Sequence, residues 1–303
     1  MTMPDPNSFY SLLMNNEALM SRDGRLFHTT LDALTQQRGL PLERYKQVPD
    51  YAHLTDERVI DVLFDERNDA QRKRCIGDIS RDAFTQRFDH GLGVYGDKMD
   101  RLVDVFSCTS FPETYFHPQI AQVLHGSGKL MNPNAAARRV GETALIMVQA
   151  MGAHCLATMA LVAASHLMRN VRGNANFNSD TVEFTLLTFS YFGAKRSGVK
   201  EADWFFYWRV FGSLMGLGPD RLHDNFDQAA GRMRELHKQC PSSLTEHSKA
   251  LLDVFVNAFK LTTAEIESYN AKGLISKRLH AYLVGADLWP KGVLRTKGVV
   301  DDA

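Results

Sequence analysis

The stretch NPNAAARRVGETALIMVQAMGAHCLATMALVAASHLMRNVRGNANFN, residues 132–178, is the most apolar part of the chain and decides its fold. Its opening Asn-Pro pair signals a helix start, because proline at the first helical position loses no needed hydrogen bond and has its φ preset. We expect one helix over about Pro133–Ala150 and, after an interruption at Gly152, a second over about Ala153–Arg172. Two successive apolar helices must be enclosed by others, so this pair is expected at the centre of the molecule.

Both expected helices carry polar side chains where a core would favour apolar ones. Residues three or four positions apart share a helix face, which places Arg139, Glu142 and Thr143 on one stripe of the first helix. On the second helix, His166 shares a stripe with small and apolar residues and with Arg169. The residues alone leave two interpretations. One is an ion pair beside a satisfied core histidine, and the other is a dry cofactor pocket with an axial iron ligand.

Length and periodicity set the fold class. The 303 residues are ample for a buried core. Helical periodicity dominates and no convincing alternating run occurs, so we predict an all-α fold built as one large helical bundle. Residues 1–50 show short helical patterns between glycine and proline breaks and are predicted to form an N-terminal helical extension, with residues 51–303 as the main helical domain.

Charge and cysteine content exclude several classes of protein. Lysine plus arginine equals aspartate plus glutamate at 35 each, which disfavours nucleic acid and anionic membranes as partners. The four cysteines are widely spaced without a Cys-x-x-Cys pair, so neither a zinc site nor a disulfide framework is expected and a reducing cytoplasm fits best. No secretory signal is recognisable at the N-terminus. The longest apolar run, Ala153–Ala164, is too short to span a bilayer.

Start signals predict further helices after and before the central stretch. Three capping boxes are expected, formed by Asp180 with Glu183, Ser243 with Glu246, and Thr262 with Glu265. The pair His117-Pro118 predicts another helix start, because proline is tolerated in the first turn.

Two weaker patterns are not expected to carry chemistry. The glycines of DHGLGVYGD, residues 89–97, do not follow a strand and lack the full dinucleotide spacing, so we expect no phosphate binding there. Glu113 and His117 stand at i,i+4, a spacing that suits a metal, but Pro118 breaks the chain beside them. A structural role is expected for both.

The segment KEADWFFYWRVFGSLMGLGPD, residues 200–220, is apolar nearly all round. Such a helix is buried, and Arg209 is the charge amid its aromatic run. A buried arginine requires an anionic partner. A cofactor carboxylate or Asp203 would meet that need.

Six segments in order resemble the heme-binding oxygenases of the latex-clearing protein and MpaB family. They are HPQIAQVLHGSGKL, RRVGET, ASHLMRN, NSDTVEFTLLTFSYFG, YWRVFGSLMGLGPD and YLVGADLWP. The most telling matches are Arg139-x-x-x-Thr143, a histidine two dozen residues later, and the Trp-Arg-x-x-Gly-x-Leu-x-Gly of residues 208–216. The resemblance covers about residues 67–290 and implies an all-α bundle enclosing one heme b.

The resemblance also implies roles for residues. His166 matches the axial iron ligand, with His154 as the alternative. Glu142, Arg139 and Thr143 would lie on the distal side as the catalytic group, and Arg169, Trp208 and Arg209 would bind the cofactor alongside His166. In rubber-cleaving members a lysine stands where this chain has Glu142, so polymer cleavage is not expected.

The implied activity is that of a heme b-dependent oxygenase, or a peroxygenase-type oxidase, in which dioxygen or peroxide oxidises an apolar or aromatic small molecule. Two alternatives from other classes stay open: a non-catalytic heme-binding or sensing protein, and a cofactor-free helical interaction module. A di-iron bundle is disfavoured, because no Glu-x-x-His pair occurs on an expected helix.

Overall fold

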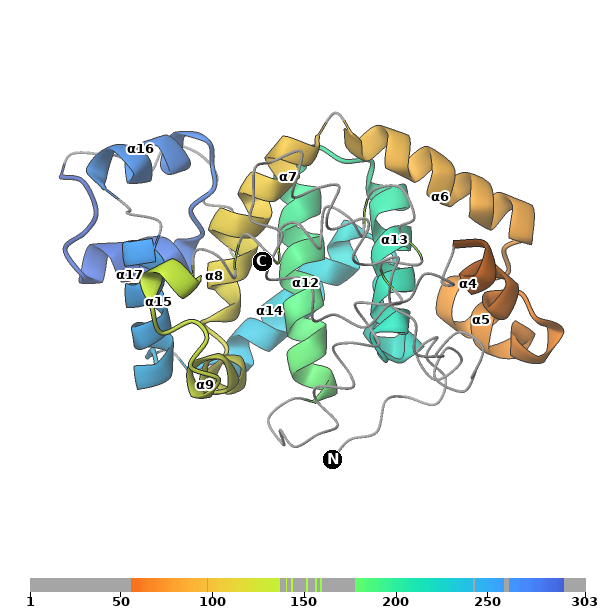
Figure 1. Cartoon of the computed structure of the whole chain (residues 1–303), viewed down its shortest axis with the longest axis horizontal. Coiled ribbons are helices and arrows are strands. Elements are labelled where there is room, and N and C mark those ends of the chain that lie inside the picture. The colour runs from red at the N-terminus through yellow and green to blue at the C-terminus, as the bar shows by residue number, and fades with distance from the viewer. Residues whose placement is uncertain are drawn as a thin grey trace. The chain divides into compact units, whose positions relative to one another are not determined.

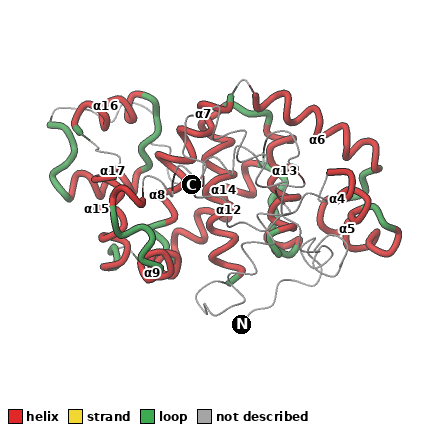
Figure 2. The backbone as a smooth tube through the Cα atoms, viewed as in Figure 1, coloured by secondary structure: helices red, strands yellow, loops and turns green. Residues whose placement is uncertain are grey.

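The computed structural model describes residues 56–96, 98–136, 140, 143, 151, 156, 159, 178–241, 243–258 and 262–291. Among these residues the regular elements are helices, and none is a strand (Figures 1 and 2). The predicted all-α fold is thereby confirmed. The predicted extension over residues 1–50 lies outside the described residues, and its boundary stays a prediction. No helix among the described residues is long and apolar enough to cross a membrane.

The chain divides into two compact units, each assembled from separate stretches of sequence. The first comprises residues 1–97, 145–173 and 202–223, and the second comprises residues 98–144, 174–201 and 224–303. Each unit therefore owes its core to segments that are distant in the chain.

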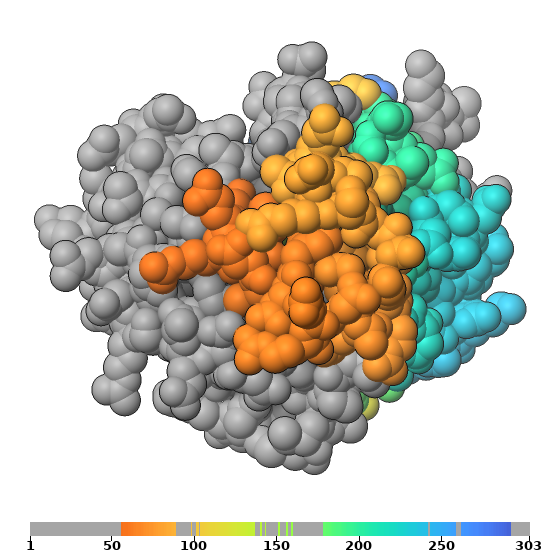
Figure 3. All heavy atoms as spheres, turned by 90° about the vertical axis from the view of Figure 1, so that its right-hand side faces the viewer, coloured from red at the N-terminus to blue at the C-terminus, as the bar shows by residue number. Residues whose placement is uncertain are grey.

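The first unit contains α4 (Asp56–Leu63), α5 (Asp69–Ile76), α6 (Arg81–Gly96) and nearly all of α13 (Glu201–Leu214). Helix α4 is amphipathic and buries Val59, Ile60, Val62 and Leu63. Beyond its end at Leu63, the Asp65 side chain accepts a hydrogen bond from the Arg67 backbone N–H and starts a short 3₁₀ turn, Glu66–Asn68. Figure 3 shows α4, α5 and α6 gathered on one face.

Helix α6 continues through the glycine-rich stretch in which we expected no phosphate binding. Its sixteen residues run to Gly96, so Gly91 and Gly93 are helical. The aromatic side chains Phe84 and Phe88 of α6 pack against Phe206 of α13 at centroid distances of 5.8 and 6.0 Å. These contacts attach α6 to α13 within the first unit.

The second unit contains α7 (Met99–Val105), a π-helical turn (Phe106–Ser110), α8 (Phe111–Thr114), α9 (Pro118–Gly126), α12 (Ser179–Ser197), α14 (Phe226–Gln239), α15 (Glu246–Ala258), α16 (Thr263–Ala271) and α17 (Lys277–Gly285). Helix α12 packs against α7, α8 and α14, while α9 packs against α15 and α8 against α17 (Figure 1). A core of side chains from α8, α9, α15, α16 and α17 includes Tyr115, Leu252 and Leu279.

Helix starts test the capping predictions one by one. The box of Thr262 and Glu265 on α16 is confirmed. The box predicted for Asp180 and Glu183 is wrong, since α12 is capped two residues earlier by Asn178, with Thr181 as its partner. An Asn-x-x-Thr pair satisfies the same orphan N–H groups, which leaves Glu183 available for another contact.

The box predicted for Ser243 and Glu246 is also wrong. Helix α15 begins at Glu246, and the Ser248 backbone N–H donates to the Thr245 hydroxyl at 3.1 Å. Thr245 is therefore the residue that caps this helix, because a β-hydroxyl reaches an N–H three positions on.

The central apolar stretch is described at isolated positions. The Asn132 side chain accepts from the backbone N–H groups of Asn134 and Ala135 at 2.9 and 3.3 Å, which confirms the predicted helix start. Residues 133–136, 140, 143, 156 and 159 are helical and Met151 lies in a turn. These positions agree with two helices separated near Gly152. The other residues of the two helices lie outside the described ones.

Candidate functional site

Three of the seven residues predicted to form a heme site are described. Thr143 is helical and half-buried, Trp208 is buried and Arg209 is half-buried. Four lie outside the described residues, as does the alternative ligand His154. They are Arg139, Glu142, His166 and Arg169.

Trp208 belongs to an aromatic cluster on α13. Its ring lies 5.6 Å from that of Trp204 and 5.7 Å from those of Tyr207 and Phe211. Ten of the fourteen residues of this helix are buried, so the predicted all-round burial is confirmed. A wall of this kind suits the apolar edge of a porphyrin as well as it suits a plain core.

Arg209 has a partner that sequence reasoning did not anticipate. Its Nε and Nη2 atoms donate to the Cys75 backbone carbonyl at 3.0 and 2.6 Å, beside the C-terminal end of α5. Asp203, proposed from sequence as its partner, accepts from Nε of Arg87 at 3.3 Å. A helix-end carbonyl thus engages the fork of Arg209, and its cofactor role stays a prediction.

A second polar centre lies in the second unit, where sequence reasoning predicted only structural roles. Glu113 of α8 is fully buried. Its Oε1 atom lies 3.4 Å from Nε2 of His237 on α14 and 3.7 Å from Nη1 of Arg278 on α17. Both distances allow ion pairing, but neither carboxylate oxygen makes a well-formed hydrogen bond with a described residue.

Opposing effects set the pKa of Glu113. Burial alone would raise it, but the contacts with His237, Arg278 and Ser276 outweigh burial and hold the pKa below its ordinary value. The carboxylate is therefore ionised at neutral pH. It provides a fixed negative charge inside the unit, and the positive charge of the half-buried Arg278 compensates it.

His117 and Cys240, in the same region as Glu113, favour their uncharged forms. His117 packs its ring 4.9 Å from Phe184, and burial lowers its pKa, with Arg278 adding to the shift and Asp180 opposing it. Burial raises the pKa of the Cys240 thiol, which favours the uncharged form. Glu113 lies beside His237 and Arg278, whereas the His117 ring packs on Phe184, and the structural role expected for the pair stays a prediction.

Arg278 connects the buried charge to a pocket. The pocket has a volume of about 540 Å³ and opens between the end of α8, α15, α17 and the segment before α15. Its described lining residues are Phe116, Pro241, Leu244, Lys249, Asp253, Arg278, Ala281, Tyr282, Gly285 and Ala286. All of them belong to the second unit.

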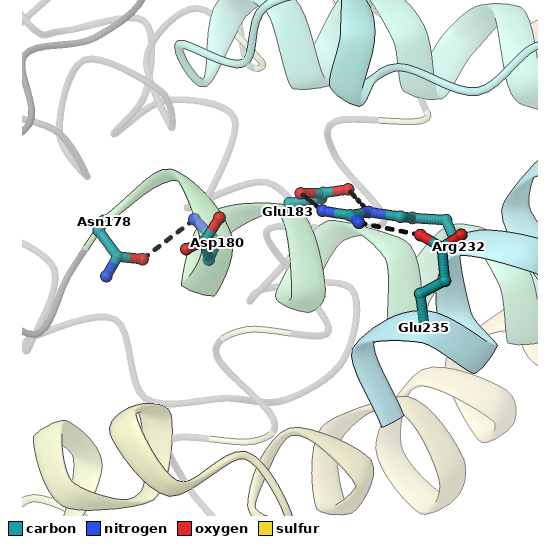
Figure 4. Close-up of polar contacts among 5 residues, drawn as sticks. All are labelled: Asn178, Asp180, Glu183, Arg232 and Glu235. Carbon is teal, nitrogen blue, oxygen red and sulfur yellow. Dashed lines mark hydrogen bonds and ion pairs between the residues drawn. The ribbon is translucent and has the colours of Figure 1, made fainter. Parts of the chain in front are cut away.

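Another buried carboxylate of this unit has an entirely different environment. Glu183 of α12 is 1% exposed and accepts two hydrogen bonds from Arg232 of α14, at 2.6 Å from Nε and 3.0 Å from Nη2 (Figure 4). The third arm of Arg232, Nη1, donates to Glu235 at 3.0 Å. This bidentate pair joins two helices and has the geometry of a structural ion pair.

Sequence reasoning missed the Glu113 centre because Glu113 lies more than 100 residues from both His237 and Arg278 in the chain. The available signal was a carboxylate inside the apolar run FPETYF, residues 111–116. No spacing rule connects it to His237 or Arg278. Among the described residues no group of three or more histidine, cysteine, aspartate or glutamate side chains is arranged to hold a metal ion.

Comparison with models of known protein families found no match, and comparisons with curated proteins and with solved structures found none either.

Proposed function

We propose that the protein is a heme b-dependent oxidoreductase that acts on an apolar or aromatic small molecule, with dioxygen or peroxide as oxidant. The observation that carries the proposal is the ordered set of family-like motifs, from HPQIAQVLHGSGKL to YLVGADLWP, in a chain whose regular elements, among the described residues, are helices. The half-buried Thr143 on its helix and the aromatic wall around Trp208 support it.

The proposal assigns each motif residue a task. An imidazole nitrogen of His166 would hold the iron, and the heme when bound would supply the redox chemistry with the oxidant. Glu142 would hold and deliver a proton on the distal side, with Arg139 countering its charge and Thr143 on the same stripe. Trp208 would face the macrocycle, whereas Arg209 is engaged with the Cys75 carbonyl and we route no step through it.

An absorption spectrum of freshly purified, heme-supplemented protein tests the proposal directly. We expect a Soret band that His166→Ala abolishes or shifts strongly, while His154→Ala keeps it. The reverse pattern would make His154 the ligand. A colourless wild-type protein would overturn the proposal and favour a cofactor-free helical interaction module. Removing residues 1–50 should leave the band unchanged.

Glu142→Gln separates catalysis from heme binding or sensing. The amide keeps shape and hydrogen-bonding reach but loses the ionisable proton, so turnover should fall about 10²-fold at matched heme content. Oxygen or peroxide consumption with a panel of aromatic substrates is the measurement. Unchanged turnover would mean that Arg139 and Glu142 form only a structural ion pair. A wild-type protein that binds heme but shows no turnover would instead be a heme-binding or sensing protein.

A further inference from the structure

The pocket of the second unit has the dimensions of a ligand site. Its volume of about 540 Å³ lies within the range of roughly 300–1,000 Å³ that small-molecule pockets occupy. Apolar side chains of Phe116, Leu244 and Ala281 line part of it, so an apolar body can be accommodated.

The charges on the pocket wall favour a singly charged anion. Lys249 and Arg278 are cationic, and Asp253 is the carboxylate among the described lining residues. Asp253 accepts a hydrogen bond from the Tyr282 hydroxyl, which holds it to one side of the wall. Lys249 and Arg278 attract an anion, whereas Asp253 on the wall and the ionised Glu113 behind Arg278 oppose the higher charge of a phosphate, so the balance favours a monoanion.

Arg278 is held in place before any ligand arrives. Its guanidinium carbon lies 4.7 Å from the centre of the Phe116 ring, and its Nη1 atom lies 3.7 Å from the buried Glu113 carboxylate. Stacking on one side and a fixed counter-charge behind restrict the rotamers of this side chain. A preorganised guanidinium loses less entropy on binding a carboxylate than a free one does.

We propose that this pocket binds an amphipathic monocarboxylate, with Arg278 and Lys249 contacting the carboxylate and Phe116, Leu244 and Ala281 contacting the apolar body. The proposal does not rest on the proposed function, because none of the residues assigned a heme role lines the pocket. It assigns a binding site and no covalent step.

Isothermal titration of the full chain with octanoate tests the proposal, with octanol and inorganic phosphate as matched probes. We expect saturable binding of octanoate and at least tenfold weaker binding of both other probes. If octanol bound as tightly as octanoate, the two cations would have no role in binding. If phosphate bound as tightly, the pocket would have no preference for a carboxylate. If octanoate showed no saturable binding, the proposed site would be refuted.

Two glycines provide a steric test with a built-in control. Gly285 lines the pocket and Gly126 does not, yet each is the last residue of its helix and has open space around an added Cβ. Gly285→Leu should weaken octanoate binding at least tenfold by filling the pocket, while Gly126→Leu leaves it unchanged. Equal effects of the two substitutions would contradict the location of the site.

Charge substitutions identify the anion-binding groups. Lys249→Gln should weaken octanoate binding about threefold, as expected for an exposed ammonium, and Lys238→Gln, which changes an exposed lysine outside the lining, should not. Arg278→Lys keeps a charge opposite Glu113 but loses the planar fork, so about tenfold weaker binding is expected. Wild-type affinity in Arg278→Lys and Lys249→Gln alike would refute the assignment of the two cations.

Discussion

The two buried glutamates of the second unit, Glu183 and Glu113, are alike in burial and opposite in bonding. Glu183 accepts two hydrogen bonds from Arg232 in a planar fork, at 2.6 and 3.0 Å. Glu113 has the His237 ring at 3.4 Å and the Arg278 guanidinium at 3.7 Å, and it makes no well-formed hydrogen bond among the described residues. The first arrangement satisfies both carboxylate oxygens, and the second balances charge without saturating either oxygen.

The difference shows what each region does with a buried charge. The paired hydrogen bonds between Glu183 and Arg232 hold α12 against α14, and they occupy both oxygens of the carboxylate. The looser Glu113 centre leaves Arg278 able to serve the pocket as well. A saturated pair is therefore a structural joint, whereas an unsaturated one can support a binding site.

Removing Arg232 is expected to have the largest effect on stability. Arg232→Leu would remove the guanidinium that donates two hydrogen bonds to the buried Glu183 carboxylate, which costs about 3 kcal/mol in the free energy of unfolding. Urea unfolding followed by circular dichroism measures the loss. Glu235→Ala is the control, because it removes only the exposed third contact and should cost less than about 0.5 kcal/mol. Similar losses of unfolding free energy in both variants would show that the buried Glu183–Arg232 pair contributes no more than the exposed Arg232–Glu235 contact.

Neutralising each glutamate compares the two centres directly. Glu183→Gln keeps the shape but turns one acceptor into a donor facing a guanidinium, so we expect a loss of about 2 kcal/mol. Glu113→Gln breaks no well-formed hydrogen bond and also removes the cost of burying a charge, so a loss of about 1 kcal/mol or less is expected. The same unfolding assay applies. A larger loss at Glu113 than at Glu183 would reverse the comparison.

The pH dependence of stability gives the smallest effect. Because the folded-state pKa of Glu113 lies below the ordinary value of 4.5, its ionisation stabilises the fold above that value, and this contribution is lost as pH falls through the folded pKa. The unfolding midpoint of the wild type should therefore fall more steeply than that of Glu113→Gln between about pH 5 and pH 3. Parallel curves would show that the pKa of Glu113 is not lowered.

Local signals predicted much of the fold because they act over a few residues. The starts at Asn132 and Thr262 follow from side chains that reach N–H groups two or three positions on. The helix beginning at Pro118 follows from proline's preset φ at the first helical position. The errors at Asp180 and Ser243 are equally local. Several residues near each start have suitable oxygens, and the pattern does not decide which of them stands at the cap.

The candidate site was less accessible to sequence reasoning. The burial of Glu183 and its pairing with Arg232 depend on how α12 meets α14, a long-range contact with no signature in either helix. Arg209 illustrates the same limit, because the need for a partner was predicted but the Cys75 carbonyl is invisible in a side-chain pattern. The motif residues Arg139, Glu142 and His166 stay predictions, together with heme b and a cytoplasmic location.

The π-helical turn at Phe106–Ser110 has a consequence for how the Glu113 centre tolerates changes in chain length. A π turn contains one residue more than an α turn, so it absorbs a single inserted residue within a continuous helical rod. Deleting Cys108 would remove that extra residue and return the turn to ordinary α geometry, with α8 keeping its rotation about the helix axis and the Glu113 carboxylate keeping its direction. A deletion of one residue within α7 would instead rotate α8 by about 100°, one residue's step around the helix. The direction of this buried charge thus tolerates the loss of a residue in the π turn but not in the α-helix before it.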